Sequence, residues 1–260
     1  MPKLENVNGA PCWVDMTSAD LAACKPFYTA LFGWSFEEMG EEFGRYNIIS
    51  IGDDVLGGAM QHNPDFMGPE AFSVWSLYFS TNDAEATLKK AEELGGTTTV
   101  PPMEIPTQGV MAEGTDSTGV SYGLWQPSGL QGTAKFGEHG FPAWFELHTR
   151  NFAKASEFYS QVLGTDLGAN EMGEGMEYHT LDINGEQKAG IWNVDGVLPE
   201  SSPEGWNIYF FSDDPDATVA AAKELGGTVI MEPEDTEYGR MATVADPAGA
   251  VFNIIGNMPG

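Results

Sequence analysis

Short segments of the chain alternate between hydrophobic and polar residues, and longer amphipathic stretches separate them. Residues 12–17 alternate with a period of two, which predicts a strand with one buried face. The stretch from about Asp20 to Leu31 has helical spacing, with Asp20 as the N-cap and Gly33 as the stop. Pro26 falls inside this stretch and removes one helical hydrogen bond, so we expect a kink or a later helix start.

The order strand, helix and three strands occurs twice in the first half of the chain. The strands predicted after the first helix lie at residues 35–39, 45–51 and 55–61. The next set comprises a strand at 74–81, a helix at 84–94 and strands at 97–100, 110–114 and 120–126. Each set is a βαβββ module. Segments 66–72 and 126–142 are rich in Gly and Pro without periodicity, which predicts linkers.

The whole pattern is then repeated 131 residues later. Trp13 recurs as Trp144, Trp75 recurs as Trp206, and the run Glu-Leu-Gly-Gly-Thr that begins at Glu93 begins again at position 224. A period this long indicates a duplicated domain, because solenoid repeats are only ~20–50 residues long. We therefore expect two domains, at residues 1–127 and 141–260, joined by a linker at 128–140.

Composition limits the setting in which the protein works. No apolar run approaches the ~20 residues of a membrane-spanning helix, and no basic segment followed by an apolar one opens the chain as in a secretory signal. The two cysteines, Cys12 and Cys24, both lie in the first repeat, so a disulfide framework is not expected. The expected location is therefore the reducing cytoplasm.

Charge limits the partners. The chain has 39 acidic and 11 basic residues and a formal net charge of −28. The electrostatic field of this negative charge repels nucleic acids and anionic membranes. The simplest interpretation of the acidic residues, which are spread along the chain, is a solvated surface. The expected partner is a small molecule. A tandem duplication forms a pseudo-dimer within one chain, so we expect a monomer.

Three local motifs point to a family. They are Phe-Tyr-x-x-Leu-Phe-Gly-Trp from Phe27, Phe-Tyr-x-x-Val-Leu-Gly from Phe158, and Asp-Pro-Ala-Gly-Ala-Val-Phe from Asp246. With the paired βαβββ modules, the chain resembles the vicinal oxygen chelate superfamily of glyoxalases, bleomycin-resistance proteins and extradiol dioxygenases. Its tandem layout also resembles the glyoxalase-like actinobacterial antigen and "hydroxylase" branch. The resemblance implies an α+β fold in which four modules form two glyoxalase-like domains, each a half-open sheet cup with helices outside.

Strand alternation then assigns side chains to the inside of each cup. In the first half the inward positions are Trp13, Asp15, Thr17, Ser76, Tyr78, Gly123 and Trp125. In the second half they are Trp144, Glu146, His148, Asn207, Tyr209 and Asn253.

Metal-dependent members of the resembled family carry a His on the first strand of each module and a Glu on a closing strand. The matching positions hold Trp13, Ser76 and Gly123 in the first half and Trp144, Asn207 and Asn253 in the second. None of these residues is a usual ligand for Zn, Fe or Ni. We therefore expect no cofactor.

A divalent metal in the second domain is the rival hypothesis. Glu146 and His148 share one strand face, and they would form a three-ligand site if His179 also turned inward. The simpler interpretation is that His148 is hydrogen-bonded to Glu146 or to the backbone.

Each half keeps a Trp, a carboxylate two residues later and a Tyr on the facing strand: Trp13, Asp15 and Tyr78, then Trp144, Glu146 and Tyr209. Aromatic walls with one acid suit a flat, largely apolar or aromatic ligand, although such residues also simply fill small barrels. The leading hypothesis is metal-free binding for sequestration, resistance or sensing.

The alternative is an enzyme of the same fold. It would be a metal-dependent lyase or dioxygenase that uses Glu146 and His148, or a metal-free acid–base enzyme that uses Asp15 or Glu146. Arg240 stands on a predicted strand and either anchors a ligand carboxylate or pairs with a surface acid.

Overall fold

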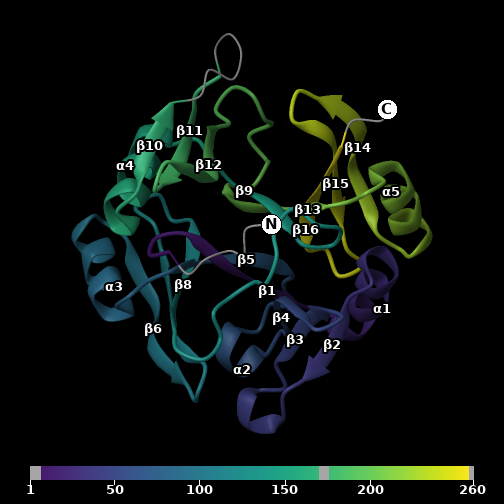
Figure 1. Ribbon diagram of the computed structural model, residues 1–260, viewed down its shortest axis with the longest axis horizontal. Coiled ribbons are helices and arrows are strands. Elements are labelled where there is room, and N and C mark those ends of the chain that lie inside the picture. Colours follow the sequence, from purple (N-terminus) through teal and green to yellow (C-terminus); the bar gives the residue numbers. More distant parts are fainter. Residues whose placement is uncertain (1–6, 170–175, 258–260) are drawn as a thin grey trace.

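The computed structural model describes residues 7–169 and 176–257. Residues 1–6, to which the expectation about a secretory signal refers, lie outside that part. Each half of the chain forms one eight-stranded mixed sheet (Figure 1). The strand order is β2-β3-β4-β1-β5-β8-β7-β6 in the first sheet and β10-β11-β12-β9-β13-β16-β15-β14 in the second. The predicted α+β architecture, with four modules in two domains, is confirmed.

The bounds of the elements follow the repeat. The first sheet contains β1 (Pro11–Ser18), β2 (Ser35–Glu38), β3 (Asn47–Ile51), β4 (Asp54–Gln61), β5 (Val74–Ser80), β6 (Thr97–Ile105), β7 (Gly109–Thr115) and β8 (Ser121–Pro127). The second contains β9 (Pro142–Thr149), β10 (Asp166–Ala169), β11 (Tyr178–Ile183), β12 (Glu186–Asn193), β13 (Gly205–Phe211), β14 (Thr228–Thr236), β15 (Gly239–Ala245) and β16 (Val251–Gly256). The α-helices are α1 (Leu21–Phe32), α2 (Pro64–Met67), α3 (Ala84–Glu93), α4 (Phe152–Leu163) and α5 (Pro215–Glu224).

The two modules of each half join through their first strands. β1 pairs antiparallel with β5, and β9 pairs antiparallel with β13, so both modules of a half share one sheet. A repeat of this kind is compatible with modules that pair within a half or that exchange between halves. The structure shows pairing within a half.

Local signals explain the first helix and one departure from the prediction. Asp20 caps α1 by accepting the N–H of Ala23 at 3.1 Å, and Gly33 ends it in the left-handed region at φ 72°. Pro26 lies inside α1, which still begins at Leu21, so the later start does not occur. Strand β6 extends to Ile105, past the predicted end at residue 100, because it is an edge strand with irregular register, where proline is tolerated.

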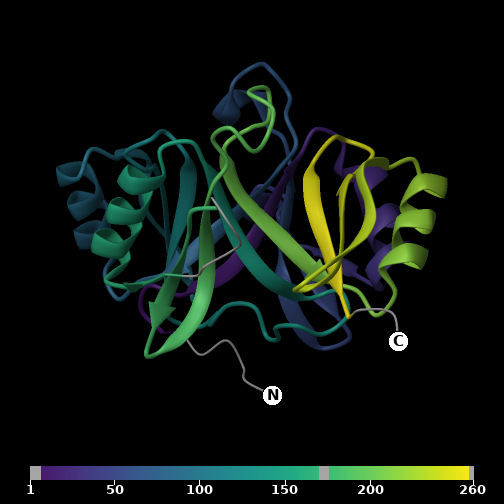
Figure 2. The same cartoon turned by 90° about the horizontal axis from the view of Figure 1, so that it is seen from above.

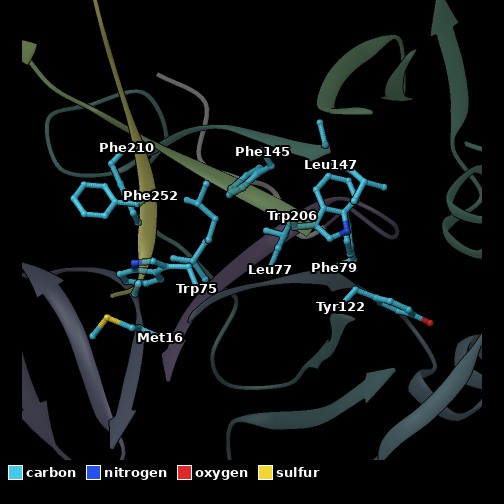
Figure 3. Close-up of a cluster of buried hydrophobic side chains, with 14 of the residues drawn as sticks. Met16, Trp75, Leu77, Phe79, Tyr122, Phe145, Leu147, Trp206, Phe210 and Phe252 are labelled. Atoms are coloured by element: carbon cyan, nitrogen blue, oxygen red, sulfur yellow. The ribbon is translucent and has the colours of Figure 1, made fainter. Parts of the chain in front are cut away.

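The helix sides of the two sheets face each other and form one core. Trp75 of β5 lies 5.2 Å from Phe210 of β13 between ring centroids, and Phe79 lies 5.1 Å from Trp206 (Figure 3). Helix α1 packs beside α5 at one flank, and α3 packs beside α4 at the other (Figure 2). The opposite side of each sheet is therefore turned away from the core.

Within the described part of the chain, no helix has both the length and the apolar composition needed to cross a membrane.

Candidate ligand-binding site

Two equivalent sets of side chains lie on the sheet sides that face away from the shared core. The first cup is defined by Trp13, Asp15, Tyr46, Tyr78 and Glu113. The second cup is defined by Trp144, Glu146, His148, Tyr178 and Tyr209. The strand register is equivalent in the two sets, because Trp13 is opposite Tyr78 and Trp144 is opposite Tyr209.

In the second cup the Glu146 carboxylate is the centre of a hydrogen-bond network. It is buried, with an 8% exposed fraction. The hydroxyl of Tyr178 donates to Oε2 at 2.8 Å and that of Tyr209 donates to Oε1 at 2.9 Å. His148 Nε2 also lies 2.9 Å from Oε1. Donors thus surround both oxygens of the buried carboxyl group, which satisfies their hydrogen-bonding capacity.

The two tyrosines act as donors in this network. Burial and then the charge of Glu146 raise the pKa of Tyr178 and Tyr209, so both hydroxyls keep their protons at neutral pH. The indole N–H of Trp144 donates to the Tyr178 oxygen at 3.0 Å. A continuous chain therefore runs from Trp144 through Tyr178 to Glu146, and it orients the indole ring and the carboxylate together.

A glycine makes room for the tyrosine in each cup. A Cβ placed on Gly190 would lie 1.8 Å from the Tyr178 hydroxyl, and one on Gly58 would lie 1.7 Å from the Tyr46 hydroxyl. Gly190 is opposite Glu146 and Gly58 is opposite Asp15 in the strand register. Because these glycines have no side chain, each tyrosine ring can lie over its neighbouring strand and bring its hydroxyl to the carboxyl group.

The first cup has a different arrangement of acids. Trp13 Nε1 donates to the Tyr46 hydroxyl at 3.1 Å, as Trp144 does to Tyr178. Tyr78, however, donates at 2.5 Å to Glu113 of β7. Asp15 is one methylene shorter than Glu146, and its Oδ1 is buried without a hydrogen-bond partner. In the first cup, therefore, the tyrosines face two different carboxyl groups, Asp15 and Glu113, whereas in the second cup both tyrosines donate to Glu146.

The Asp15 carboxyl is set apart by its proton affinity. Burial, and secondarily the charge of Glu113, raise its pKa from 3.8 to about 7, while a hydrogen bond from Tyr46 opposes the rise. Asp15 therefore exchanges its proton near neutral pH. A carboxyl of this kind fits acid–base chemistry.

The two cups differ in how far they are covered. Trp13, Tyr78 and Trp125 are buried together in one apolar cluster, whereas Trp144 and Tyr209 are partly exposed. The linker after β8 covers the first cluster: Trp125 Nε1 donates to the Leu130 carbonyl at 2.9 Å, and the Thr133 N–H donates to the Cys12 carbonyl at 2.8 Å. The second cup is the more accessible one.

The remaining predicted cup residues have mainly structural contacts. Asn207 Nδ2 donates to the Gly205 carbonyl at 3.0 Å, and the Asn253 Oδ1 accepts from the Thr243 hydroxyl at 2.6 Å. Ser76 is opposite Asp15 in the strand register and partly exposed. These three residues line the cups as predicted, but only Asn253 has an unpaired buried atom, Nδ2.

Arg240 does not belong to either cup. Its guanidinium donates through Nε and Nη2 to Asp216 of α5, at 2.5 and 2.7 Å, and through Nη1 to Asp235, at 2.8 Å. Helix α5 lies on the helix side of the second sheet, so Arg240 points away from Glu146. Of the two roles considered for it, the structure shows the ion pair with surface acids, and its place among the ligand-binding residues was wrong.

His179 also faces the helix side. Its Nδ1 lies 3.0 Å from the Ser156 hydroxyl of α4, and its ring is 4.5 Å from that of Phe152 between centroids. Neighbouring strand residues point to opposite faces, so Tyr178 enters the cup and His179 leaves it. The three-ligand site of Glu146, His148 and His179 therefore does not form, and His148 is hydrogen-bonded to Glu146, as the simpler interpretation expected.

The positions that the resemblance assigns to metal ligands do not fit a divalent ion. Trp144 is engaged with Tyr178, and Asn253 with Thr243. At Gly123 a Cβ would lie 2.2 Å from the ring of Tyr78, so that ring fills the space of the closing-strand glutamate. Within residues 7–169 and 176–257, no group of three or more His, Cys, Asp or Glu side chains is placed to hold a metal.

Three cup residues were missed by the sequence interpretation, Tyr46, Glu113 and Tyr178, and so was Trp192, which is opposite His148 in the strand register. The strand around Tyr46 was predicted, but its faces were not assigned. The repeat held a signal, because Tyr46 and Tyr178 occur at nearly the same offset as the other pairs. Glu113 gave no such signal, since Thr243 occupies its place in the second half.

Comparison with known sequences agrees with the duplicated fold. The sequence model of the Glyoxalase/Bleomycin resistance protein/Dioxygenase superfamily matches residues 12–121 and 142–254. A protein of Mycobacterium bovis designated CFP32, whose name describes it provisionally as a glyoxylase, is 34% identical over 267 residues, covering 100% of this chain and 99% of the relative. The anthracycline biosynthesis protein DnrV of Streptomyces peucetius is 33% identical over 263 residues, covering 95% and 93%.

Solved structures share the fold at low identity. The 2,3-dioxygenase LapB of Pseudomonas sp. KL28 aligns with a TM-score of 0.63 and 16% identity, over 96% of this chain and 92% of that one. The Mn(II)-bound glyoxalase of Novosphingobium aromaticivorans aligns with a TM-score of 0.64 and 18% identity, over 97% and 83%. With the family match in both halves, these findings show that the chain belongs to the Glyoxalase/Bleomycin resistance protein/Dioxygenase superfamily.

Proposed function

We propose that the protein binds a small, flat, largely aromatic molecule in the second cup without a metal ion, as a protein of sequestration, resistance or sensing. The single observation that carries this proposal is the network around Glu146. Its donors come from three strands and hold an aromatic wall, Trp144, next to a buried acid. An arrangement that is ordered before ligand arrives lowers the entropic cost of binding.

The choice between the two cups follows from access. Trp144 and Tyr209 are partly exposed, while their counterparts Trp13 and Tyr78 have exposed fractions of 6% and 4%. A ligand can stack on Trp144 without displacing the linker, whereas the first cup is filled by its own side chains. Aromatic faces of this kind favour flat apolar rings.

Two of the relatives are named as anthracycline biosynthesis proteins, from Streptomyces peucetius and Streptomyces sp.. Anthracyclines are flat compounds of several fused rings. Such a ligand agrees in chemistry with an aromatic wall beside hydrogen-bonding groups, and this supports the proposal for the present chain.

The test uses two neutral three-ring probes, 2-(hydroxymethyl)anthracene and 2-(hydroxymethyl)anthraquinone. A probe that binds the native state and not the unfolded state stabilises the protein, by ~2.7 kcal/mol at a probe concentration of 100 Kd, and so raises its Tm. We expect at least one probe to raise the Tm of the wild-type protein, and we expect Trp144→Ala to abolish that increase.

The first cup offers the matched control, Trp13→Ala. This variant should keep the full probe-induced increase in Tm, because its indole lies in the covered cup. If neither probe stabilises the wild-type protein, or if Trp144→Ala responds like Trp13→Ala, the proposed binding site is wrong.

One observation favours a second candidate function, metal-free acid–base catalysis in the first cup. The Asp15 carboxyl combines a pKa of about 7 with a buried, unpaired Oδ1. A general base is most effective when its pKa lies near the working pH. This candidate requires a substrate that reaches Asp15 past the linker, and its test is an Asp15→Asn variant that loses turnover while keeping the binding of probes in the second cup.

A further inference from the structure

The central strands of the second sheet carry two buried hydrogen-bond donors without an acceptor. The acceptor oxygens of Glu146 are surrounded by the hydroxyls of Tyr178 and Tyr209 and by His148. Among the described side chains of the four central strands, β12, β9, β13 and β16, two buried polar atoms have no hydrogen-bond partner. They are Trp192 Nε1 and Asn253 Nδ2, and both can only donate. On β11, the strand that carries Tyr178, Thr180 Oγ1 and Asp182 Oδ1 are also buried without a partner.

Both donors belong to the cup side of the sheet. Trp192 is opposite His148 in the strand register, and its ring lies 5.0 Å from the His148 ring between centroids. Asn253 is opposite Tyr209, and its other side-chain atom, Oδ1, accepts from Thr243 at 2.6 Å. In this arrangement the Thr243 hydroxyl donates to Oδ1, and the Nδ2 amino group is the end of the Asn253 amide without a partner.

An unpaired donor in a buried place is costly. Leaving such a group without an acceptor costs ~1–3 kcal/mol, and native proteins keep few of them without a reason. Asn253 has an exposed fraction of only 6%, and the Trp192 nitrogen is buried. A ligand that supplies acceptor atoms would remove this cost on binding.

We propose that the ligand of the second cup is a polycyclic aromatic ketone or quinone, whose carbonyl oxygens accept hydrogen bonds from Trp192 Nε1 and Asn253 Nδ2. This inference rests on the proposed function and specifies the chemical class bound at the same site. Carbonyl oxygens on a flat ring system are acceptors only, so they complement the two donors. A phenol would need to turn its hydroxyl hydrogen away from both.

The placement of the donors indicates the size of the ligand. Trp192 is on β12 and Asn253 on β16, with β9 and β13 between them. At ~4.8 Å between neighbouring strands, the two backbones are about 14 Å apart along the sheet. The side chains project inward from both positions and shorten this span. A system of three or more fused rings fits between them better than a single ring.

The experiment compares the same two neutral probes, which differ only in the two ring carbonyls. Equilibrium dialysis gives the Kd of each for the wild-type protein and for the variants Asn253→Asp and Trp192→Phe. We expect the anthraquinone to bind at least ~10-fold more tightly than the anthracene, since one satisfied hydrogen bond is worth about that factor. Each variant removes one of the two proposed donor groups, so each should reduce this preference.

The control is Trp13→Phe, which makes the same type of change in the first cup and should leave the preference as it is. If Asn253→Asp does not fold, Trp192→Phe tests the inference alone. Equal affinity of the two probes, or an unchanged preference in the folded variants, overturns the carbonyl assignment while Trp144-dependent binding still supports the proposed function. Absence of binding by both probes overturns both.

Discussion

The hydroxyl of Tyr28 donates a hydrogen bond to Oδ2 of Asp246 at 3.2 Å, although the two residues are 218 positions apart. Tyr28 in turn accepts from Trp75 Nε1 at 3.0 Å. The other oxygen of Asp246 accepts the backbone N–H groups of Ala248 and Ala250, both at 2.9 Å, which shapes the Asp-Pro-Ala-Gly turn. Two of the motifs that indicated the family thus meet across the interface of the two halves.

Replacement of this tyrosine should weaken the interface. Tyr28→Phe removes the donor to buried Asp246 and leaves Trp75 Nε1 without an acceptor. We expect the free energy of unfolding to fall by ~1–3 kcal/mol. Urea denaturation measures it, and Tyr159→Phe is the mirror variant, since the Tyr159 hydroxyl accepts from Trp206 at 2.9 Å. A loss below ~0.5 kcal/mol in Tyr28→Phe, the range of ordinary surface changes, would contradict this account.

The glycine opposite Glu146 should tolerate no side chain. In Gly190→Ala the new methyl group would lie 1.8 Å from the Tyr178 hydroxyl, so the ring must move and its bond to Glu146 must break. Overpacking of this kind costs ~1–3 kcal/mol. We expect lower stability together with loss of probe binding. The control is Gly205→Ala in β13, where a Cβ meets nothing within 4 Å. Equal behaviour of the two variants would show that the Tyr178 position is not needed.

The raised pKa of Asp15 predicts a specific dependence of stability on pH. Its pKa is 3.8 when unfolded and about 7 when folded, so the folded state binds the additional proton between these values. Stability from this group is complete below pH ~4 and is lost as the pH rises to ~7. Above pH 7 the ionised group destabilises the fold by up to ~4 kcal/mol, at ~1.4 kcal/mol per pKa unit.

Asp15→Asn removes this dependence. Compared with the wild-type protein, the variant should gain several kcal/mol of relative stability between pH 4 and pH 8, as urea denaturation at both values would show. The comparison of two chains at each pH cancels the other acidic residues. A stability difference that is the same at pH 4 and pH 8 would mean that Asp15 titrates normally.

Arg240→Ala should leave ligand binding unchanged. The guanidinium bonds only to Asp216 and Asp235 in the described contacts, on the helix side of the second sheet. Its ion pairs involve half-exposed carboxylates, so the loss of stability should be ~1 kcal/mol or less. Probe affinity is measured by equilibrium dialysis. A marked loss of affinity in this folded variant would return Arg240 to the binding site.

Much of the site could be predicted from the sequence on strands whose side chains alternate regularly between the two faces of the sheet. The period of two correctly placed Trp13, Asp15, Trp144 and Glu146 on the cup side, because that period is a geometric property of an extended chain. The same rule was not applied to the strands that carry Tyr46 and Tyr178. It therefore missed the two hydroxyl groups that connect each Trp to the acid.

The sequence by itself determined the duplicated βαβββ modules, the capped helices and the family, because periodicity, caps and turns are properties of neighbouring residues. Only the tertiary structure decided that modules pair within a half, that the helix sides of both sheets form one core, and that the linker covers one cup and not the other. It also decided that Tyr78 bonds Glu113 while Tyr209 bonds Glu146. These outcomes depend on which distant atoms come within bonding distance, and the order of residues does not record those distances.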